Sequence, residues 1–370
     1  MKIRNFAWIA TWKITRRCNL YCGYCDHASM RKATYRENID YEKAIENIRE
    51  YAPKIVNISG GEPTLVEQLS WILSEIKKRW NPFIRIVHNG TNPEKILSCL
   101  PNLDRLVISM DGPDPVNMAN RGISAELVLK KLNNVLPQVL ASNVEVVINC
   151  VLSTANLGYM REFLKLVHDV SPLIWVSFTP LIPPDDKHSI LSDKSHFQQF
   201  ISMFNDLKHQ GYLVTHTFDG IMRHKDFTNI QCFNQYFIIR IAPEGQVLTC
   251  AMNSRMSGGH YTYYFKKLFS KNGLSKGFNR IKKKAAQGLL RSPDFSCNTI
   301  CACENWLDLI FLGIHSDYSA IYARGLYGRM TKEDYDEAET FVRKYINPNF
   351  NAATLKAIVD AAGNDKKNKF

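Results

Sequence analysis

The sequence predicts an α/β fold in which parallel strands alternate with helices, a partial (β/α)6 barrel of the TIM type followed by a small second domain and a helical C-terminus. Three observations predict it. Six strand-like apolar runs alternate with helical stretches of 3.6-residue periodicity between residue 7 and about residue 210. Polar motifs follow several of these strands, where barrels of this type carry their chemistry. Five of the ten cysteines occur only after residue 231, which marks a separate region.

The predicted strands are rich in β-branched and aromatic residues, and each is followed by a helical pattern. We expect strands at residues 7–15, 54–59, 83–87, 106–110, 144–151 and 175–181. Helical stripes run over residues 41–48, 69–76, 93–100, 128–135, 160–167 and 197–204. Asp40 and Ser124 can cap the first and fourth helices, while Thr331 and Asn351 begin two C-terminal ones. Alternation of apolar strands and helices predicts a barrel or an open doubly wound sheet, and a cysteine-rich loop directly after the first strand favours the barrel.

Length and composition indicate a globular protein of about two domains. The 370 residues are 45% hydrophobic, enough for a large core. No window approaches ~18 uncharged apolar residues, so we expect no membrane span. Residues 1–25 mix a short apolar run with basic residues, unlike a cleavable signal. Ten cysteines in such a chain indicate metal ligands in a reducing cytoplasm.

Cys18, Cys22 and Cys25 place three thiols within eight residues. A structural zinc site normally takes four protein ligands, so three leave one position open for a substrate or cofactor. Thiolates favour zinc, Cu(I) or iron–sulfur clusters. The alternatives at this stage are an iron–sulfur cluster with one free iron, a zinc site completed by a residue such as His27, and a reactive surface cysteine cluster.

This triplet, with Tyr24 before its third cysteine, resembles the signature of the radical S-adenosylmethionine (SAM) superfamily. The resemblance implies a [4Fe–4S] cluster on the three cysteines, whose open iron is chelated by SAM. It also implies a one-electron donor of the flavodoxin or ferredoxin type. Reductive cleavage of SAM would give a 5′-deoxyadenosyl radical, which takes a hydrogen atom from the substrate.

Short polar motifs at the ends of later strands support the resemblance. The family uses such positions to contact SAM, which implies cofactor-binding roles for Tyr24, Ser59, Gly60, Gly61, Glu62, Asn89, Ser109 and Asn149. In the motif after the second predicted strand, Gly60 and Gly61 let the backbone approach a ligand closely. The alternative is an ordinary glycine turn before a helix. Asp111 is expected to hold its own turn, and His88 stands where threonine is commoner in the family.

The second region resembles the opening of the SPASM and shorter twitch domains, because Cys232 is followed by Gly245 and Cys250. Residues 241–250 are expected to form two short strands joined at a Glu-Gly turn. The resemblance implies one auxiliary [4Fe–4S] cluster, held by Cys232, Cys250 and two of a second group of thiols. That group is Cys297, Cys301 and Cys303. The spacing of this group departs from the family pattern, so the two cysteines that bind the auxiliary cluster are left open. The third thiol is either a spare ligand or a catalytic hydrogen-atom donor.

Residues 251–293 contain ten basic residues and no acidic one, in a chain of net charge +12. The segment predicts an anionic partner such as a peptide, a phosphorylated small molecule or a lipid, or else a solvated helix face. No RNA-binding motif accompanies it, so nucleic acid is not favoured.

These features divide the chain into a radical SAM barrel at 1–210, a linker at 211–229, a twitch-like domain at 230–305 and a helical extension at 306–370, whose last six residues are expected to be disordered. The expected function is hydrogen abstraction from a carbon of an anionic substrate, leading to epimerisation, oxidation or bond formation. The alternatives are maturation of a ribosomally made peptide and a non-catalytic metal-binding scaffold for nucleic acid. The sequence leaves the substrate, the reaction outcome and the oligomeric state open.

Overall fold

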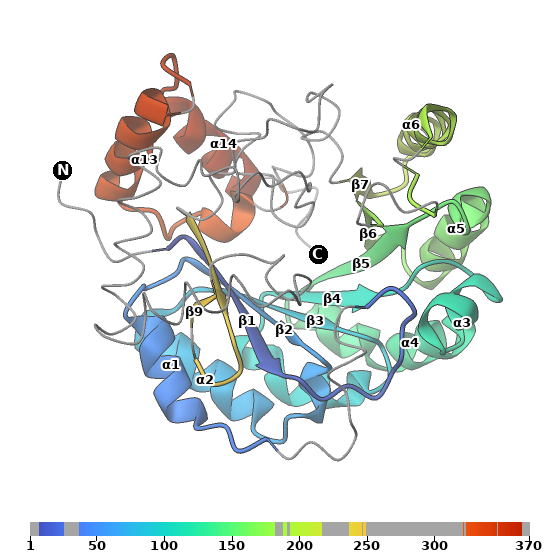
Figure 1. The fold of residues 1–370 in the computed structure, drawn as a ribbon, viewed down its shortest axis with the longest axis horizontal. Coiled ribbons are helices and arrows are strands. Elements are labelled where there is room, and N and C mark those ends of the chain that lie inside the picture. Colours follow the sequence, from blue (N-terminus) through green and yellow to red (C-terminus); the bar gives the residue numbers. More distant parts are fainter. Residues whose placement is uncertain are drawn as a thin grey trace, which may run out of the picture.

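The computed structural model describes residues 7–25, 37–181, 188–190, 193–216, 237–245, 247–248, 321, 323–345 and 347–364. Its strands form one open sheet in the order β7-β6-β5-β4-β3-β2-β1-β8-β9 (Figure 1). They are β1 (Ile9–Thr15), β2 (Ile55–Gly60), β3 (Phe83–His88), β4 (Arg105–Ser109), β5 (Glu145–Leu152), β6 (Trp175–Pro180), β7 (Val214–His216), β8 (Ile238–Ile241) and β9 (Val247–Leu248). Neighbours from β7 to β8 pair in parallel, and β9 is antiparallel to β8.

The six predicted strands are confirmed as β1 to β6, which lie side by side in sequence order. The periodicity did not reveal β7, which has only three residues, or the pairing of β8 with β1. The expected hairpin at residues 241–250 corresponds to β8 and β9, which extend the main sheet beyond β1. Gly245 forms its turn with φ +81°, a conformation that favours glycine. The division into domains stays a prediction.

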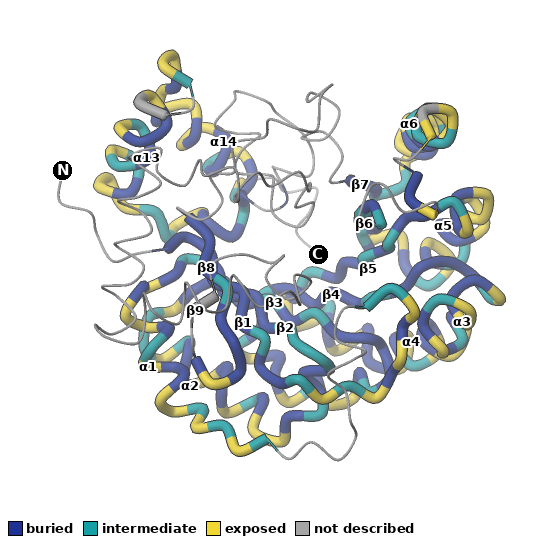
Figure 2. Tube along the Cα trace, in the orientation of Figure 1, coloured by how far each residue is buried: buried dark blue, intermediate teal, exposed yellow. Residues whose placement is uncertain are grey.

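The helices follow the strands as the alternation predicts, and they cover the outer side of the sheet (Figure 1). They are α1 (Tyr41–Arg49), α2 (Leu69–Trp80), α3 (Val116–Arg121), α4 (Ala125–Ala141), α5 (Met160–Val170) and α6 (Lys194–His209), with 3-10 turns at Pro63–Leu65, Pro93–Asn102 and Leu157–Tyr159. The expected caps are confirmed, because Asp40 accepts from Lys43 N and Ser124 from Leu127 N. In Figure 2 the strands are buried and the helices show exposed outer faces.

Two apolar clusters pack against the sheet. The larger fills the space between the sheet and helices α1, α2, α4, α5 and α6. The second packs α13 (Lys332–Tyr345) and α14 (Ala352–Asn364) against Trp8, Ile55 and Phe83, where strands begin. The C-terminal helices therefore cover the amino-terminal ends of the central strands, opposite the edge where the polar motifs lie.

A partly buried ion pair joins β4 and β5 at this amino-terminal end. Arg105, at the start of β4, donates from Nε to the Glu145 carboxylate at the start of β5, 2.6 Å away. Arg324 reaches the same carboxylate from the C-terminal segment. Among the described residues, no helix has the length and apolar character needed to cross a membrane.

Candidate active site at the carboxyl ends of the strands

The cysteine loop directly follows β1. Cys22 is buried, while Cys18 and Cys25 are half-buried, and Cys25 N donates to Cys22 O at 3.1 Å. Burial raises the pKa of the Cys22 thiol; the guanidinium of Arg121 opposes this, whereas the neighbouring Cys25 and Cys18 add to it. Because the neighbouring thiols disfavour ionisation of Cys22, a bound cation is needed to hold it as a thiolate.

The loop after β2 packs directly on the backbone that enters the cysteine loop. Gly61 N donates to Thr15 O and Glu62 N to Arg17 O, each at 2.7 Å. A Cβ atom at Gly61 would lie 2.0 Å from Arg17 O, so only glycine fits. The close approach seen here is to the protein backbone, and contact of Ser59, Gly60 and Gly61 with SAM stays a prediction.

Glu62 is fully buried and bonded within the protein. Its carboxylate accepts from Thr64 N at 2.9 Å, from Thr64 Oγ1 at 2.6 Å and from Asn89 N at 2.8 Å. Burial raises the pKa of Glu62, and the hydrogen bonds from Thr64 and Asn89 oppose that rise. The contacts show that Glu62 ties the end of β2 to the end of β3.

Asn89 connects β3 to the first cysteine. Its Nδ2 donates to Asn19 Oδ1 at 2.8 Å and lies 3.9 Å from Cys18 Sγ, while its Oδ1 accepts from Thr91 N at 3.0 Å. The preceding residue, His88, is buried and accepts from Gly90 N at 3.0 Å through Nδ1. Burial lowers the pKa of His88 to about 4, so a neutral imidazole holds this turn.

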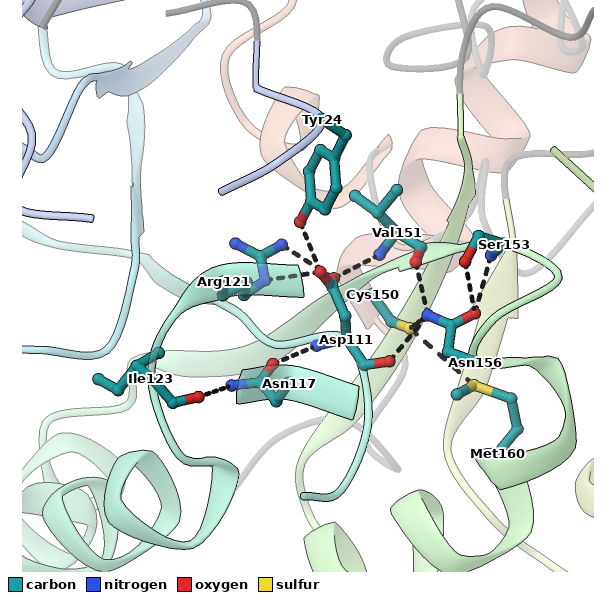
Figure 3. Close-up of polar contacts among 10 residues, drawn as sticks. All are labelled: Tyr24, Asp111, Asn117, Arg121, Ile123, Cys150, Val151, Ser153, Asn156 and Met160. Carbon is teal, nitrogen blue, oxygen red and sulfur yellow. Dashed lines mark hydrogen bonds and ion pairs between the residues drawn. The ribbon is translucent and has the colours of Figure 1, made fainter. Parts of the chain in front are cut away.

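Tyr24 binds the end of β4. Its hydroxyl donates to Asp111 Oδ2 at 2.5 Å, and Arg121 Nε lies 2.9 Å from the same oxygen (Figure 3). Burial raises the pKa of Tyr24 well above its usual range, so the phenol remains a donor. Asp111 was expected to hold only its own turn, and no pattern in the sequence pointed to Arg121.

Ser109 and Asn149 are register partners that begin a row of polar side chains across the sheet. The row continues through Ser177 to Thr215 on β7. Their strand neighbours pack toward the helices, so the row faces the opposite, inner side of the sheet. Asn149 Oδ1 accepts from Thr179 Oγ1 at 3.0 Å. The hydroxyls of Ser177 and Thr215 are buried and have no hydrogen-bond partner among the described residues, and strand alternation alone did not single them out.

The remaining predicted ligands, Cys232, Cys250, Cys297, Cys301 and Cys303, lie outside the described residues, as do residues 251–293. In the part of the chain that is described, no three acidic, histidine or cysteine side chains are grouped to hold a metal ion. Thiolates that each bind a different iron of a cluster lie farther apart than ligands that share one ion. Cys99 and Cys150 are fully buried in the core, where a free cysteine behaves as a small hydrophobic residue.

Comparison with known proteins assigns the cysteine loop and strands β2 to β4 to a family. Residues 12–141 match the Radical SAM superfamily, so this part of the chain is a radical SAM domain. Enzymes of this superfamily use a [4Fe–4S] cluster and SAM.

One curated relative is a probable GTP 3′,8-cyclase of Methanococcus maripaludis, 35% identical over 108 residues. The match covers 28% of this chain and 36% of the relative, so the chain spans about a third of that protein.

Two solved structures share the fold. SuiB of Streptococcus suis, bound to its precursor peptide SuiA, is 15% identical with a TM-score of 0.54, over 70% of this chain and 62% of SuiB. The structure of anSMEcpe with AdoMet and the Cp18Cys peptide is 15% identical with a TM-score of 0.52, over 97% of this chain and 99% of that one. The expected partial barrel is therefore confirmed as the fold of the domain.

Proposed function

We propose that this protein is a radical SAM enzyme in which Cys18, Cys22 and Cys25 hold a [4Fe–4S] cluster with one iron open to SAM. When bound, the cluster and SAM would supply one-electron chemistry, in which reductive cleavage of the bond between the sulfonium sulfur and C5′ gives methionine and a 5′-deoxyadenosyl radical that can take a hydrogen atom from a substrate carbon. A one-electron donor of the flavodoxin or ferredoxin type is the proposed reductant.

The main support for this proposal is the contact between the ends of three strands and the cysteine loop. Gly61 and Glu62 fix its entry, Asn89 reaches Cys18, and Asp111 binds Tyr24. The three thiols fit the cluster in type and in number. Iron–sulfur clusters favour thiolate ligands, and a closed zinc site requires four ligands rather than three. These contacts orient the loop that carries the three thiols.

Ser109 and Asn149 support the placement of SAM beside the cluster. Both are half-buried on the inner side of the sheet, and both lie at or near the carboxyl ends of their strands. Their hydroxyl and amide groups can bind the ribose or the carboxylate of SAM. The buried hydroxyls of Ser177 and Thr215 continue this polar row away from the cysteine loop.

A peptide is the first substrate class that we propose. Both fold neighbours described above were solved with a peptide, and one matches nearly the whole chain. An anionic small molecule is the second candidate, because ten basic residues without an acidic one lie at residues 251–293. The auxiliary cluster on Cys232, Cys250 and two of the later cysteines is part of the same proposal.

The test is anaerobic reconstitution of the wild-type protein and the Cys22→Ala variant, followed by incubation with SAM and dithionite. Wild type should form 5′-deoxyadenosine and methionine, whereas Cys22→Ala should not, because two thiolates do not hold the SAM-binding iron in place. Intact SAM with bound zinc in the wild type would exclude the proposal.

A further inference from the structure

The carboxylate of Asp111 receives three hydrogen bonds and one further ion-pair contact from three separate parts of the chain (Figure 3). Oδ2 accepts from the Tyr24 hydroxyl at 2.5 Å and lies 2.9 Å from Arg121 Nε in the ion pair. Oδ1 accepts from Arg121 Nη2 and from Val151 N on β5, each at 2.9 Å. Asp111 has no exposed surface. Both carboxylate oxygens are engaged by these contacts, so an amide at this position would place an N–H group against a donor.

These contacts hold the segment between two of the cysteines. Gly23 and Tyr24 are the residues between Cys22 and Cys25, and both are held by the last turn of α3. Gly23 N donates to Asn120 O at 3.1 Å. The guanidinium carbon of Arg121 lies 5.6 Å from the centre of the Tyr24 ring. Because both intervening residues are fixed, the relative position of the Cys22 and Cys25 thiols is fixed as well.

The anchor itself is braced from both sides. Asp111 N donates to Asn117 Oδ1 at 2.8 Å, and Asn117 Nδ2 donates to Ile123 O at 2.9 Å, which ties α3 to the end of β4. Asn156 Nδ2 donates to Asp111 O and to Val151 O, each at 2.8 Å. Strand ends β4 and β5 thus act as one support for the loop.

We infer that Asp111 and Arg121 are positioning residues for the SAM-binding cluster. Together, as a charged pair, they set the separation of the Cys22 and Cys25 thiolates and the orientation of Tyr24. The inference rests on the proposed function. It assigns to two residues outside the cysteine motif a role in cluster geometry and in SAM affinity. Groups that orient metal ligands typically contribute 10–100-fold to affinity or activity, which sets the size of the expected effect.

The experiment compares four reconstituted variants with wild type. Asp111→Asn removes the charge, Tyr24→Phe removes one donor, and Asp111→Asn with Arg121→Gln removes both charges. Glu145→Gln is the matched control, because it removes the charge of the partly buried pair with Arg105 at the opposite end of the same two strands. Each is measured for thermal midpoint, for SAM affinity by calorimetry, and for the change that SAM causes in the EPR signal of the reduced cluster.

We expect Asp111→Asn to bind SAM at least about tenfold more weakly and to give an altered EPR signal. Tyr24→Phe should show a smaller change in the same direction. The double variant should regain thermal stability, since no charge is left buried alone, but not SAM affinity. Glu145→Gln should lower the thermal midpoint while its SAM affinity and EPR signal match wild type.

Wild-type SAM affinity and EPR signal in Asp111→Asn would overturn the inference, as would an equal loss of SAM affinity in Glu145→Gln. If Asp111→Asn does not fold, the double variant is used in its place. Wild-type SAM affinity in the double variant would then overturn the inference. Failure of the proposed function has a different signature, because the wild-type EPR signal would then not respond to SAM.

Discussion

The Glu62 carboxylate accepts the backbone N–H of Asn89 at 2.8 Å, and this bond joins the loop after β2 to the loop after β3. Asn89 in turn reaches the cysteine loop through Asn19 and Cys18. Glu62, which the sequence suggests as a SAM-binding residue, therefore supports the loop that carries the thiols through its bond to Asn89.

Replacement of Glu62 with Gln should weaken SAM binding about tenfold, because an amide places a donor against the N–H groups of Thr64 or Asn89. Calorimetric titration with SAM measures the effect. Glu67→Gln is the control, since Glu67 is exposed five residues further along, and it should bind SAM as wild type does. Equal affinities for the two variants would contradict the supporting role of Glu62.

Gly61→Ala should prevent formation of the SAM-binding cluster. The added Cβ would lie 2.0 Å from Arg17 O, so the loop after β2 and the entry to the cysteine loop must move apart. Gly158→Ala is a matched control, because no atom of the described residues lies within 4 Å of a Cβ there. Iron analysis after reconstitution should show a loss only in Gly61→Ala; full iron content in that variant would refute the explanation.

The pH dependence of stability should carry a contribution from His88. Its folded pKa is lowered to about 4, against about 6.5 when unfolded. The unfolded state therefore binds a proton first as pH falls, and stability is lost between these two values. By pH 5 wild type should lose about 2 kcal/mol more than His88→Gln, measured by denaturant unfolding at pH 7.5 and 5. Parallel losses in the two proteins would mean that His88 titrates normally.

The auxiliary site is separable from the first site if the two clusters occupy different parts of the chain. Replacing Cys232 and Cys250 together should lower bound iron by about half and leave SAM cleavage measurable. Iron and 5′-deoxyadenosine are assayed on the same reconstituted sample. Complete loss of iron would show that the two sets of cysteines do not act independently.

The sequence predicted six strands and the cysteine loop, because periodicity and motif spacing are local properties. It did not predict β7, which is too short to show a period, or the pairing of β8 with β1 across more than 200 residues. The partners of Tyr24 were missed for a similar reason. Asp111 and Arg121 meet only after β4 and α3 have folded against each other, and neither stands in a recognisable spacing with the cysteines.

The central claim is that Cys18, Cys22 and Cys25 leave one iron open for SAM. Electron–nuclear double resonance on the reduced protein with SAM labelled with ¹⁵N in its amino group tests it most directly. The account predicts a ¹⁵N hyperfine coupling to the cluster in wild type, which requires direct coordination of the amino group. A reduced [4Fe–4S] signal without any ¹⁵N coupling, in a sample that has bound SAM, would contradict it.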